Sequence, residues 1–229
     1  MTISQQYTRV AAEVAQACRD CGRDPFQVTL LAVSKTVQAP RVQEAIDAGA
    51  CAFGENRPEQ LMEKHAAYPN QQWHFIGNLQ SRRIHDIVPC ATLMHSVYKA
   101  SHLPKIDAAA QQVGKVQDIL LEVNVSGEES KGGIAPTQIN ELLSVAEGLA
   151  HVRVRGLMTM APRGDMEIAR ETFAHLRELE QKINREWRGA QGLPLSELSM
   201  GMSEDWRCAI SEGSTIVRIG RAIFSEDFA

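Results

Sequence analysis

The 229-residue sequence is poor in aromatic residues, which make up 5% of it, and it has no long apolar run. No stretch approaches the ~18 apolar residues that a membrane-spanning helix needs. Residues 1–10 lack a basic segment followed by an apolar run, so we expect no secretory signal. Charge imbalance is also small, because 24 Lys and Arg against 28 Asp and Glu give a net charge of −4. We therefore expect neither a membrane nor nucleic acid as a partner.

Cysteine is scarce as well, with five residues that are odd in number and widely scattered. This usage is typical of reduced thiols rather than a disulfide framework, so we expect a cytoplasmic protein. Cys18 and Cys21 form one CxxC pair, but no second pair and no suitably spaced pair of histidines follows. Two thiols near the end of a helix are the better interpretation, and we expect no metal.

The sequence does contain a regular alternation of two apolar patterns. Helical spacing marks a first helix over residues 3–21, and short apolar runs typical of buried strands then alternate with further helical segments. The expected strands are 28–34, 51–53, 73–76, 93–97, 118–125, 152–158, 197–200 and 215–219. The expected later helices are 40–48, one opening near residue 58, 83–88, 100–113, 136–149, 166–187 and 204–211.

This alternation predicts a parallel sheet of the α/β class, either an open doubly wound sheet or a closed barrel. Eight strands in this length favour a single (β/α)8 TIM-type barrel with an extra N-terminal helix. The sequence has no linker or change in composition that would divide it. We therefore expect residues 1–229 to form one domain.

Short polar and small residues follow the predicted strands at the ends where a barrel builds its active face. The segments in question are 34–36, 54–56, 77–80, 95–96, 124–127, 158–160, 199–203 and 218–220. If the strands have these bounds, the segments meet at one mouth of the barrel.

Lys35 is the most informative single residue. Strand alternation puts Leu31, Val33 and Lys35 on one face, so the amine points inward at the barrel mouth. An ammonium group in an apolar pocket loses hydration, and the neutral amine is a nucleophile that can form an imine. The alternative is a lysine at a strand end whose head reaches water.

The loops after the last two predicted strands have the features of a phosphate site, which barrels often build there. Residues 200–203 supply a glycine for close backbone approach and a hydroxyl at the head of the next helix. Gly220 and Arg221 follow the last strand and offer further backbone amides. Ser203 is also explained as a helix cap, which is compatible with phosphate binding.

Arg218 lies between Val217 and Ile219, and therefore on the opposite face from both and on the same face as Gly220. If that face is interior, the guanidinium needs a partner, either a structural salt bridge or the ring nitrogen of a bound heterocycle. A nucleophilic lysine, a phosphate cup and a cation for a pyridine nitrogen together indicate a site for pyridoxal 5′-phosphate (PLP).

Several ordered blocks of the sequence match one known family. They are residues 31–36, 53–56, 73–77 with 79–80, 95–96, 124–126, 131–133, 156–158, 199–203 with Asp205, and 217–220. On these blocks, which span nearly the whole chain, the sequence resembles the pyridoxal phosphate homeostasis protein family. The fold of that family is similar to the N-terminal barrel of alanine racemase.

The resemblance assigns roles to individual positions. It implies Lys35 as the Schiff-base lysine and Arg218 at the pyridine nitrogen. The other positions that it implies at the cofactor are Asn56 and Met202 along its sides, and Ser203, Gly220 and the amide of Arg221 at the phosphate.

Some positions depart from the family pattern. Arg57 stands where the family tends to have an aromatic residue, and Arg82 and Arg83 stand where an Asn-Lys pair is common. Tyr98 replaces a frequent acidic residue, and Arg221 replaces a residue that is typically threonine. The hydroxyl lost at position 221 weakens phosphate binding unless the charge of Arg221 compensates.

We expect a PLP carrier without catalytic residues rather than an enzyme. An arginine at the ring nitrogen disfavours protonation of that nitrogen, so the cofactor is a weak electron sink. In alanine racemase a second domain and a partner subunit supply the other base, and this chain ends about ten residues after the last predicted strand. The expected protein is a monomer that holds PLP as a Schiff base on Lys35. It supports intracellular PLP homeostasis and amino-acid balance, with PLP-dependent apo-enzymes as possible recipients.

Two alternatives stay open. One is a racemase-like PLP enzyme acting on amino acids, with His74, His95 or Tyr98 as the second base. Each of the two histidines is also explained as a hydrogen-bonded structural residue, and Tyr98 as a loop aromatic packed on the following helix. The other alternative is a cofactor-free Schiff-base aldolase that uses Lys35 on a sugar phosphate.

Overall fold

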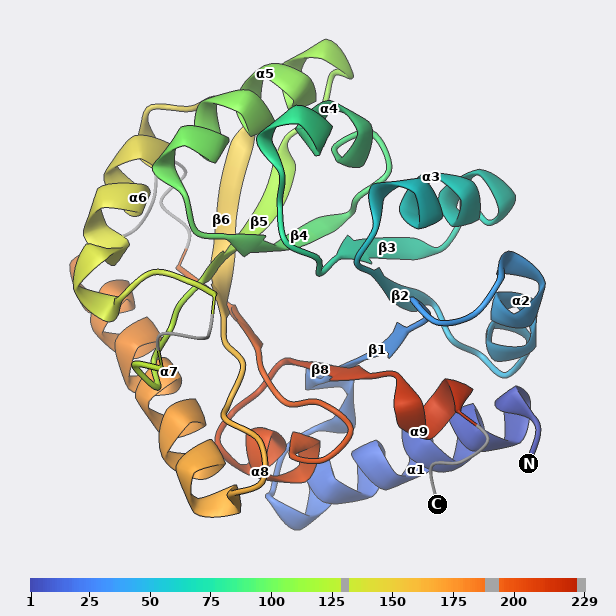
Figure 1. Ribbon diagram of the computed structural model, residues 1–229. Coiled ribbons are helices and arrows are strands. Elements are labelled where there is room, and N and C mark those ends of the chain that lie inside the picture. The colour runs from blue at the N-terminus through green and yellow to red at the C-terminus, as the bar shows by residue number, and fades with distance from the viewer. Residues whose placement is uncertain (129–131, 188–193, 226–229) are drawn as a thin grey trace.

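Eight parallel strands close into a barrel in the order in which they occur along the chain, as Figure 1 shows in a view into the barrel. The computed structural model describes residues 1–128, 132–187 and 194–225. The strands are β1 (Thr29–Val33), β2 (Ala52–Glu55), β3 (Gln72–Phe75), β4 (Leu93–Val97), β5 (Gln117–Glu122), β6 (Val152–Met158), β7 (Glu197–Ser199) and β8 (Ile216–Ile219). The predicted TIM-type barrel is therefore confirmed.

Helices form a ring outside the strands (Figure 1). They are α1 (Ile3–Asp20), α2 (Ala39–Asp47), α3 (Pro58–Ala67), α4 (Ile84–Ile87), α5 (Leu103–Gln112), α6 (Ile139–Glu147), α7 (Met166–Glu186), α8 (Trp206–Ser211) and α9 (Arg221–Phe224). Single 3-10 turns lie at η1 (Pro25–Gln27), η2 (Ser81–Arg83), η3 (Ala100–His102) and η4 (Pro136–Gln138). Among the helices of the described segments, none combines the length and the apolarity that spanning a bilayer requires.

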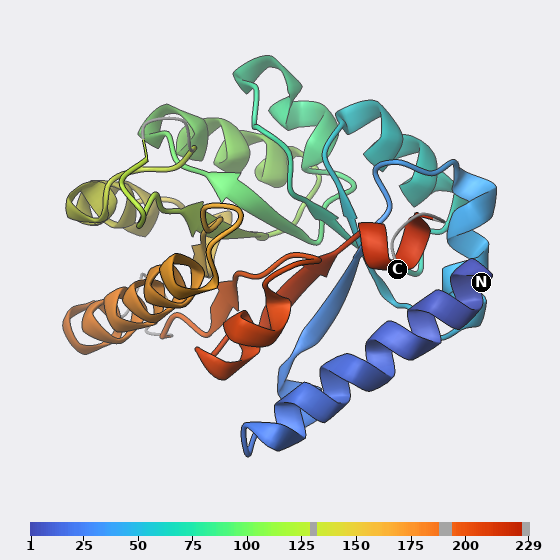
Figure 2. The ribbon, with the colours of Figure 1, turned by 60° about the horizontal axis from the view of Figure 1, so that its bottom comes forward.

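The extra helix α1 is amphipathic and closes one side of the barrel. Its buried face consists of Ile3, Gln6, Tyr7, Val10, Val14 and Cys18. Thr2 and Gln5 cap its first turn reciprocally, with backbone-to-side-chain distances of 3.0 and 3.2 Å. The helix packs against α2, α8 and α9, and Figure 2 shows it lying below β1 and α9.

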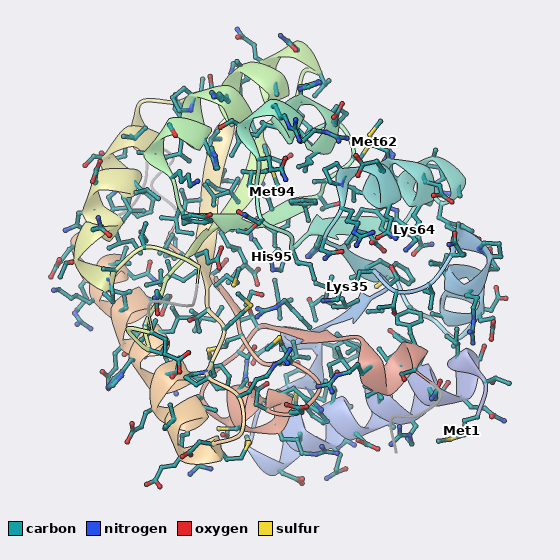
Figure 3. The ribbon with its side chains drawn as sticks, viewed as in Figure 1. Met1, Lys35, Met62, Lys64, Met94 and His95 are labelled. Atoms are coloured by element: carbon teal, nitrogen blue, oxygen red, sulfur yellow. The ribbon has the colours of Figure 1, made fainter. Side chains whose placement is uncertain are left out.

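Strand alternation divides the core into two apolar clusters. The larger one lies between the strands and the helices, and the smaller one fills the barrel. The barrel cluster contains Leu31, Ala52, Leu93, Leu120, Met158 and Ile216. Figure 3 shows the alternation on β4, where His95 lies inside the ring of strands and Met94 lies on the side of the helices. The residue two positions beyond each barrel-facing residue therefore points toward the barrel mouth.

The structure corrects the prediction for the fifth strand. We expected this strand over residues 118–125, but β5 ends at Glu122. Val123 forms only an isolated bridge with Ile134, because the chain turns at Asn124. The Asn124 side-chain oxygen accepts the backbone N–H of Gly127 at 3.0 Å, which closes that turn.

Candidate functional site

The main cavity of the site has a volume of about 450 Å³ and lies at the carboxyl ends of the strands. The loops after β1, β2, β3, β6, β7 and β8 line it. Six of the seven predicted binding residues line this cavity: Lys35, Asn56, Met202, Arg218, Gly220 and Arg221. The seventh, Ser203, lines a smaller neighbouring cavity together with Val10 and Ala222.

Lys35 lies two residues beyond the end of β1, in a turn that reaches the rim of the barrel (Figure 3). The backbone N–H of Val37 donates to the carbonyl of Ser34 at 3.0 Å and closes the turn. The lysine side chain is exposed and borders the main cavity. The amine therefore reaches both the cavity and solvent.

A buried ion pair supports this turn from the side facing α3. Lys64 Nζ donates to Glu55 Oε1 at 2.6 Å and to the carbonyl of Ser34 at 2.8 Å. The Ser34 hydroxyl donates to the same carboxylate oxygen at 2.5 Å. Burial raises the pKa of Glu55, and the hydrogen bonds from Lys64 and Ser34 oppose that rise. The pair thus ties the backbone next to Lys35 to β2 and α3.

Arg218 points into the barrel, as the alternation along β8 predicts. Its Nη1 donates to Ser199 Oγ at 2.6 Å and its Nη2 to the carbonyl of Thr159 at 2.9 Å. Burial lowers the pKa of Arg218 to about 10, while Asp205 and Glu122 act in the opposite direction. The guanidinium therefore remains charged at neutral pH.

Ser199 also links Arg218 to two histidines inside the barrel. His95 Nδ1 lies 2.9 Å from Ser199 Oγ, and His95 Nε2 lies 3.0 Å from His74 Nδ1. Arg218 can only donate, so Ser199 Oγ accepts from it. The directions of the bonds from Ser199 to His95 and from His95 to His74 depend on which ring nitrogens carry the protons.

Both histidines are kept neutral by the barrel interior. Burial lowers the pKa of His74 to about 4 and that of His95 well below its usual value. Neither ring belongs to the described residues that line the main cavity. His74 and His95 are thus hydrogen-bonded residues of the barrel interior, and a structural rather than a catalytic role stays a prediction.

The loop after β7 makes a tight turn that only glycine fits. Gly201 has a φ of +93°, and a Cβ there would lie 2.6 Å from the Cβ of Ala209. The backbone N–H of Met202 donates to Asp205 Oδ1 at 2.5 Å. Asp205 occupies the N-cap position of α8, so the interpretation of Ser203 as the cap is wrong.

The turn after β8 approaches the end of β1 closely. A Cβ at Gly220 would lie 3.0 Å from the carbonyl oxygen of Val33. Arg221 begins α9, and the N–H groups of a first helical turn have no intrahelical partner. The guanidinium of Arg221 donates to Glu204, and this hydrogen bond lowers the pKa of Glu204. The charge expected to compensate for the missing threonine is therefore shared with a carboxylate.

Asn56 borders the main cavity from the end of β2, and the neighbouring loop after β3 packs tightly against it. A Cβ at Gly77 would lie only 2.1 Å from the carbonyl oxygen of Asn56. Glycine at position 77 thus allows the two loops to meet.

A side cavity of about 250 Å³ adjoins the main one. The two cavities share Ile76, Gly77, Asn78, Met158 and Met160, and the side cavity is further lined by Ser96, Tyr98, Glu122 and Gly132. The Tyr98 hydroxyl donates to Asn78 Oδ1 at 3.0 Å. Tyr98, one of the departures from the family pattern, therefore borders this second cavity.

Glu122 is a buried charged residue of the side cavity that was not predicted from the sequence as part of the site. It lies inside the predicted strand 118–125, which extends beyond the end of β5 at Glu122. The signal was available, because Glu122 is an acidic residue on the same face as Leu120 in an apolar run. Only 5% of its surface is exposed, and burial raises the pKa of Glu122 to about 7.

The other unusual arginines lie on the surface beside the site. Arg83 forms ion pairs with Glu59 and Asp86, while Arg82 is exposed. Arg57 is an exposed residue at the N-cap position of α3. None of these three residues belongs to the described lining of either cavity.

Comparison with known proteins gives a consistent family assignment. The family model described as alanine racemase, N-terminal domain, matches residues 7–227. The pyridoxal phosphate homeostasis protein of Aquifex aeolicus is 38% identical over 229 residues, covering 99% of both chains. That of Pseudomonas aeruginosa is 39% identical over 226 residues, covering 97% of this chain and 95% of its own.

A solved structure of a similar protein extends this comparison. PipY of Synechococcus elongatus, solved with PLP bound, superimposes with a TM-score of 0.80 at 32% identity. The match covers 93% of this chain and 100% of PipY.

Proposed function

The chain belongs to the pyridoxal phosphate homeostasis proteins, whose barrel is the alanine racemase N-terminal domain, and we propose on this basis that it is a PLP-binding protein. In this proposal Lys35 holds the cofactor as a Schiff base in the main cavity. The protein thereby keeps PLP bound and releases it, which supports intracellular PLP homeostasis and amino-acid balance.

The groups around the main cavity suit the three functional parts of PLP. Lys35 offers an amine for the aldehyde, and Arg218 offers a fixed cation for the ring nitrogen. Gly220 and the first-turn amide of Arg221 offer backbone N–H groups for the phosphate, and Asn56 and Met202 would lie along the sides of the cofactor. Ser203 belongs to this phosphate set only if its side chain turns from the neighbouring cavity. When bound, the cofactor supplies an aldehyde that combines reversibly with amines.

The observation that carries the proposal is the convergence of Lys35 and Arg218 on one cavity. They come from β1 and β8, the two strands that close the barrel, and Leu31 of β1 pairs directly with Arg218. This pairing places the strand that leads to the amine of Lys35 beside the strand that carries the guanidinium of Arg218. A Schiff-base aldolase requires the amine but has no use for a cation at a ring nitrogen, so the pair favours PLP.

The same residues favour a carrier over an enzyme. The guanidinium of Arg218 keeps its proton at neutral pH, so it leaves a ring nitrogen unprotonated and the electron sink weak. His74 and His95 are neutral and bonded to each other inside the barrel. Of the residues considered as a second base, only Tyr98 borders a cavity of the site, and its hydroxyl is bonded to Asn78.

The proposal is tested by the visible spectrum of the purified protein before and after borohydride reduction, with peptide mapping of the modified residue. We expect an imine absorbance that reduction abolishes and a modification on Lys35. Lys35→Ala should lose the absorbance, and Lys105→Ala, which removes an exposed lysine on α5, should keep it. Full absorbance in Lys35→Ala would refute the assignment.

The alternatives have separate signatures in the same preparation. A racemase-like enzyme would change its spectrum with amino acids and exchange their α-protons with solvent. A cofactor-free aldolase would purify without colour and give borohydride-trapped adducts with sugar phosphates. Transfer of PLP to apo-enzymes, a monomeric state and a cytoplasmic location stay predictions.

A further inference from the structure

Glu122 is a buried carboxylate that the proposed function does not use. It is the last residue of β5, and like Leu120 it faces the inside of the barrel. Only 5% of its surface is exposed, and it borders the side cavity. No side chain of the described segments makes a hydrogen bond or an ion pair with its carboxylate.

The neighbours of Glu122 within the described ranges leave its charge without a direct partner. Arg218, on β8, is the charged group that acts on it, but both of its bonded nitrogens are engaged by Ser199 and Thr159. His95, on β4, is neutral and bonded at both ring nitrogens. Asp205, the other carboxylate facing Arg218, receives a backbone N–H. A buried carboxylate in this situation favours a cation that donates hydrogen bonds.

The rest of the side cavity is suited to a short apolar group. Ile76, Met158 and Met160 form one wall, while Ser96 and Tyr98 have hydroxyl groups already bonded to other residues. The backbone at Gly132 approaches so closely that a Cβ there would lie 2.9 Å from Glu122 Oε1. Among the described residues that line the side cavity there is no lysine or arginine, so none of these residues would pair with a carboxylate on the ligand.

We propose that the side cavity is a binding site for a small primary amine, whose ammonium group donates hydrogen bonds to Glu122 and whose carbon chain lies against Met158 and Met160. A simple alkylamine fits this description better than an amino acid. The site is a different cavity with a different ligand from the one at Lys35, although the two cavities share a wall.

Binding at this site has a pH dependence with a defined direction. Glu122 must be ionised to pair with the ammonium group, and its pKa of about 7 places that ionisation in the neutral range. Affinity should therefore rise from pH 6 to pH 8 and level off while the amine itself stays protonated. A site that did not use Glu122 would bind an alkylammonium equally well over this range.

The test is a titration of the full-length protein, as purified, with n-propylamine, followed by NMR of ¹³C-methyl-labelled methionines. We expect saturable shifts of the Met158 and Met160 methyl signals that grow from pH 6 to pH 8. 1-Propanol and glycine should bind at least about tenfold more weakly, because one lacks the charge and the other adds a carboxylate. Trimethylamine, which cannot form an imine with an aldehyde, should still shift both methyl signals.

The variant Glu122→Gln keeps the side-chain shape and should weaken propylamine binding by about tenfold or more. Glu44→Gln, at a half-buried position on α2 outside both cavities, should bind as the parent protein does. Unchanged binding in Glu122→Gln, equal binding of 1-propanol, or the absence of saturable shifts would each overturn the proposal. The pH profile of the unmodified protein tests the role of Glu122 without any variant, and a flat profile would equally overturn it. The visible spectrum reports PLP at Lys35 separately, so failure of either proposal is distinguishable from failure of the other.

Discussion

Arg218 shows how the interior of this barrel holds a charge in one orientation. Its two bonded nitrogens reach a hydroxyl on β7 and a carbonyl just beyond β6, and the hydroxyl continues the chain to His95 and His74. Every member of this chain is buried, and Arg218 is the donor in both of its own hydrogen bonds. The guanidinium is therefore positioned by the protein itself rather than by whatever occupies the cavity.

At the same scale, Glu122 makes the stability of the protein depend on pH. The pKa of Glu122 is raised from 4.5 to about 7 in the folded protein, so its stabilising effect is complete below pH 4.5 and is lost as pH rises through 7. We expect Glu122→Gln to remove this loss, which amounts to about 3 kcal/mol at most. Urea unfolding at pH 5, 6, 7 and 8 measures it. Parallel pH profiles for the variant and the parent protein would contradict the assignment, and Glu44→Gln serves as the control.

The residues of the site were predictable to different degrees. Lys35 and Arg218 could be assigned because each follows the alternation of a short strand with clear apolar neighbours. Glu122 could not, because the apolar run through Val125 concealed the point where β5 ends. Ser203 was expected at the phosphate and at a helix cap, but the turn at Gly201 gives the cap position to Asp205 instead.

At the scale of elements, the loops that carry the site contact one another directly. The turn after β1 is tied to β2 and α3 through the buried pair of Glu55 and Lys64, and Lys64, labelled in Figure 3, belongs to the buried face of α3. The loop after β3 packs on the loop after β2 at Gly77. Lys35 and Asn56 are thus held by one connected unit.

The buried pair should be far more sensitive than a surface pair with the same geometry. Glu55 with Lys64 and Glu13 with Arg207 both have an N–O distance of 2.6 Å, but only the first pair is buried. Glu55→Gln leaves an ammonium without its counter-charge and should lower the free energy of unfolding by about 3–5 kcal/mol. Glu13→Gln should lower it by less than about 1 kcal/mol. Equal effects in urea unfolding would show that burial of the pair is unimportant.

The contact between the two loops predicts a second sensitive position. Gly77→Ala places a Cβ 2.1 Å from the carbonyl oxygen of Asn56, so the loops must separate. We expect a loss of about 3 kcal/mol in the free energy of unfolding, together with weaker PLP binding in a titration of the visible absorbance. Gly148→Ala is the matched control, since its Cβ would lie 3.6 Å from the nearest atom. If both variants bind PLP as the parent does, the loop contact does not support the site.

The bounds of an element could be predicted from the sequence where its apolar pattern ended sharply. The strands β4 and β6 were predicted with the bounds that the structure has, because β-branched and apolar residues end at polar ones. The helix predicted over 100–113 instead begins with a 3-10 turn, and α5 starts at Leu103. Pro104 occupies the second helical position, where a backbone N–H would have no intrahelical partner. The N–H that proline lacks is therefore not missed at this start.

At the scale of the whole molecule, α1 connects the outside of the barrel to the side of the main cavity formed by the loops after β7 and β8. It packs against α8 and α9, the helices that follow the loops containing Met202 and Gly220. Val10 lines the same small cavity as Ser203 and Ala222. The extra helix therefore supports the part of the mouth formed by the last two strands.

Truncating a side chain on the buried face of α1 should destabilise the whole fold. Val10 is 2% exposed, and Val10→Ala should lower the free energy of unfolding by about 2 kcal/mol through lost burial and the space left behind. Val113→Ala removes the same atoms at a position that is 46% exposed and should change it by less than about 0.5 kcal/mol. Thermal or urea unfolding compares them. A loss at Val10 no larger than at Val113 would mean that α1 packs loosely.

The hydrogen-bond chain behind Arg218 has a consequence for how the protein would bind and release PLP. Because the guanidinium of Arg218 is already held in place, this side chain needs no rearrangement when PLP binds or leaves. In the proposed function, the rate of binding and release would then be set by the formation and hydrolysis of the carbon–nitrogen bond at Lys35. Such a barrel would act as a passive reservoir that takes up and releases PLP with the surrounding concentration while its own structure stays unchanged.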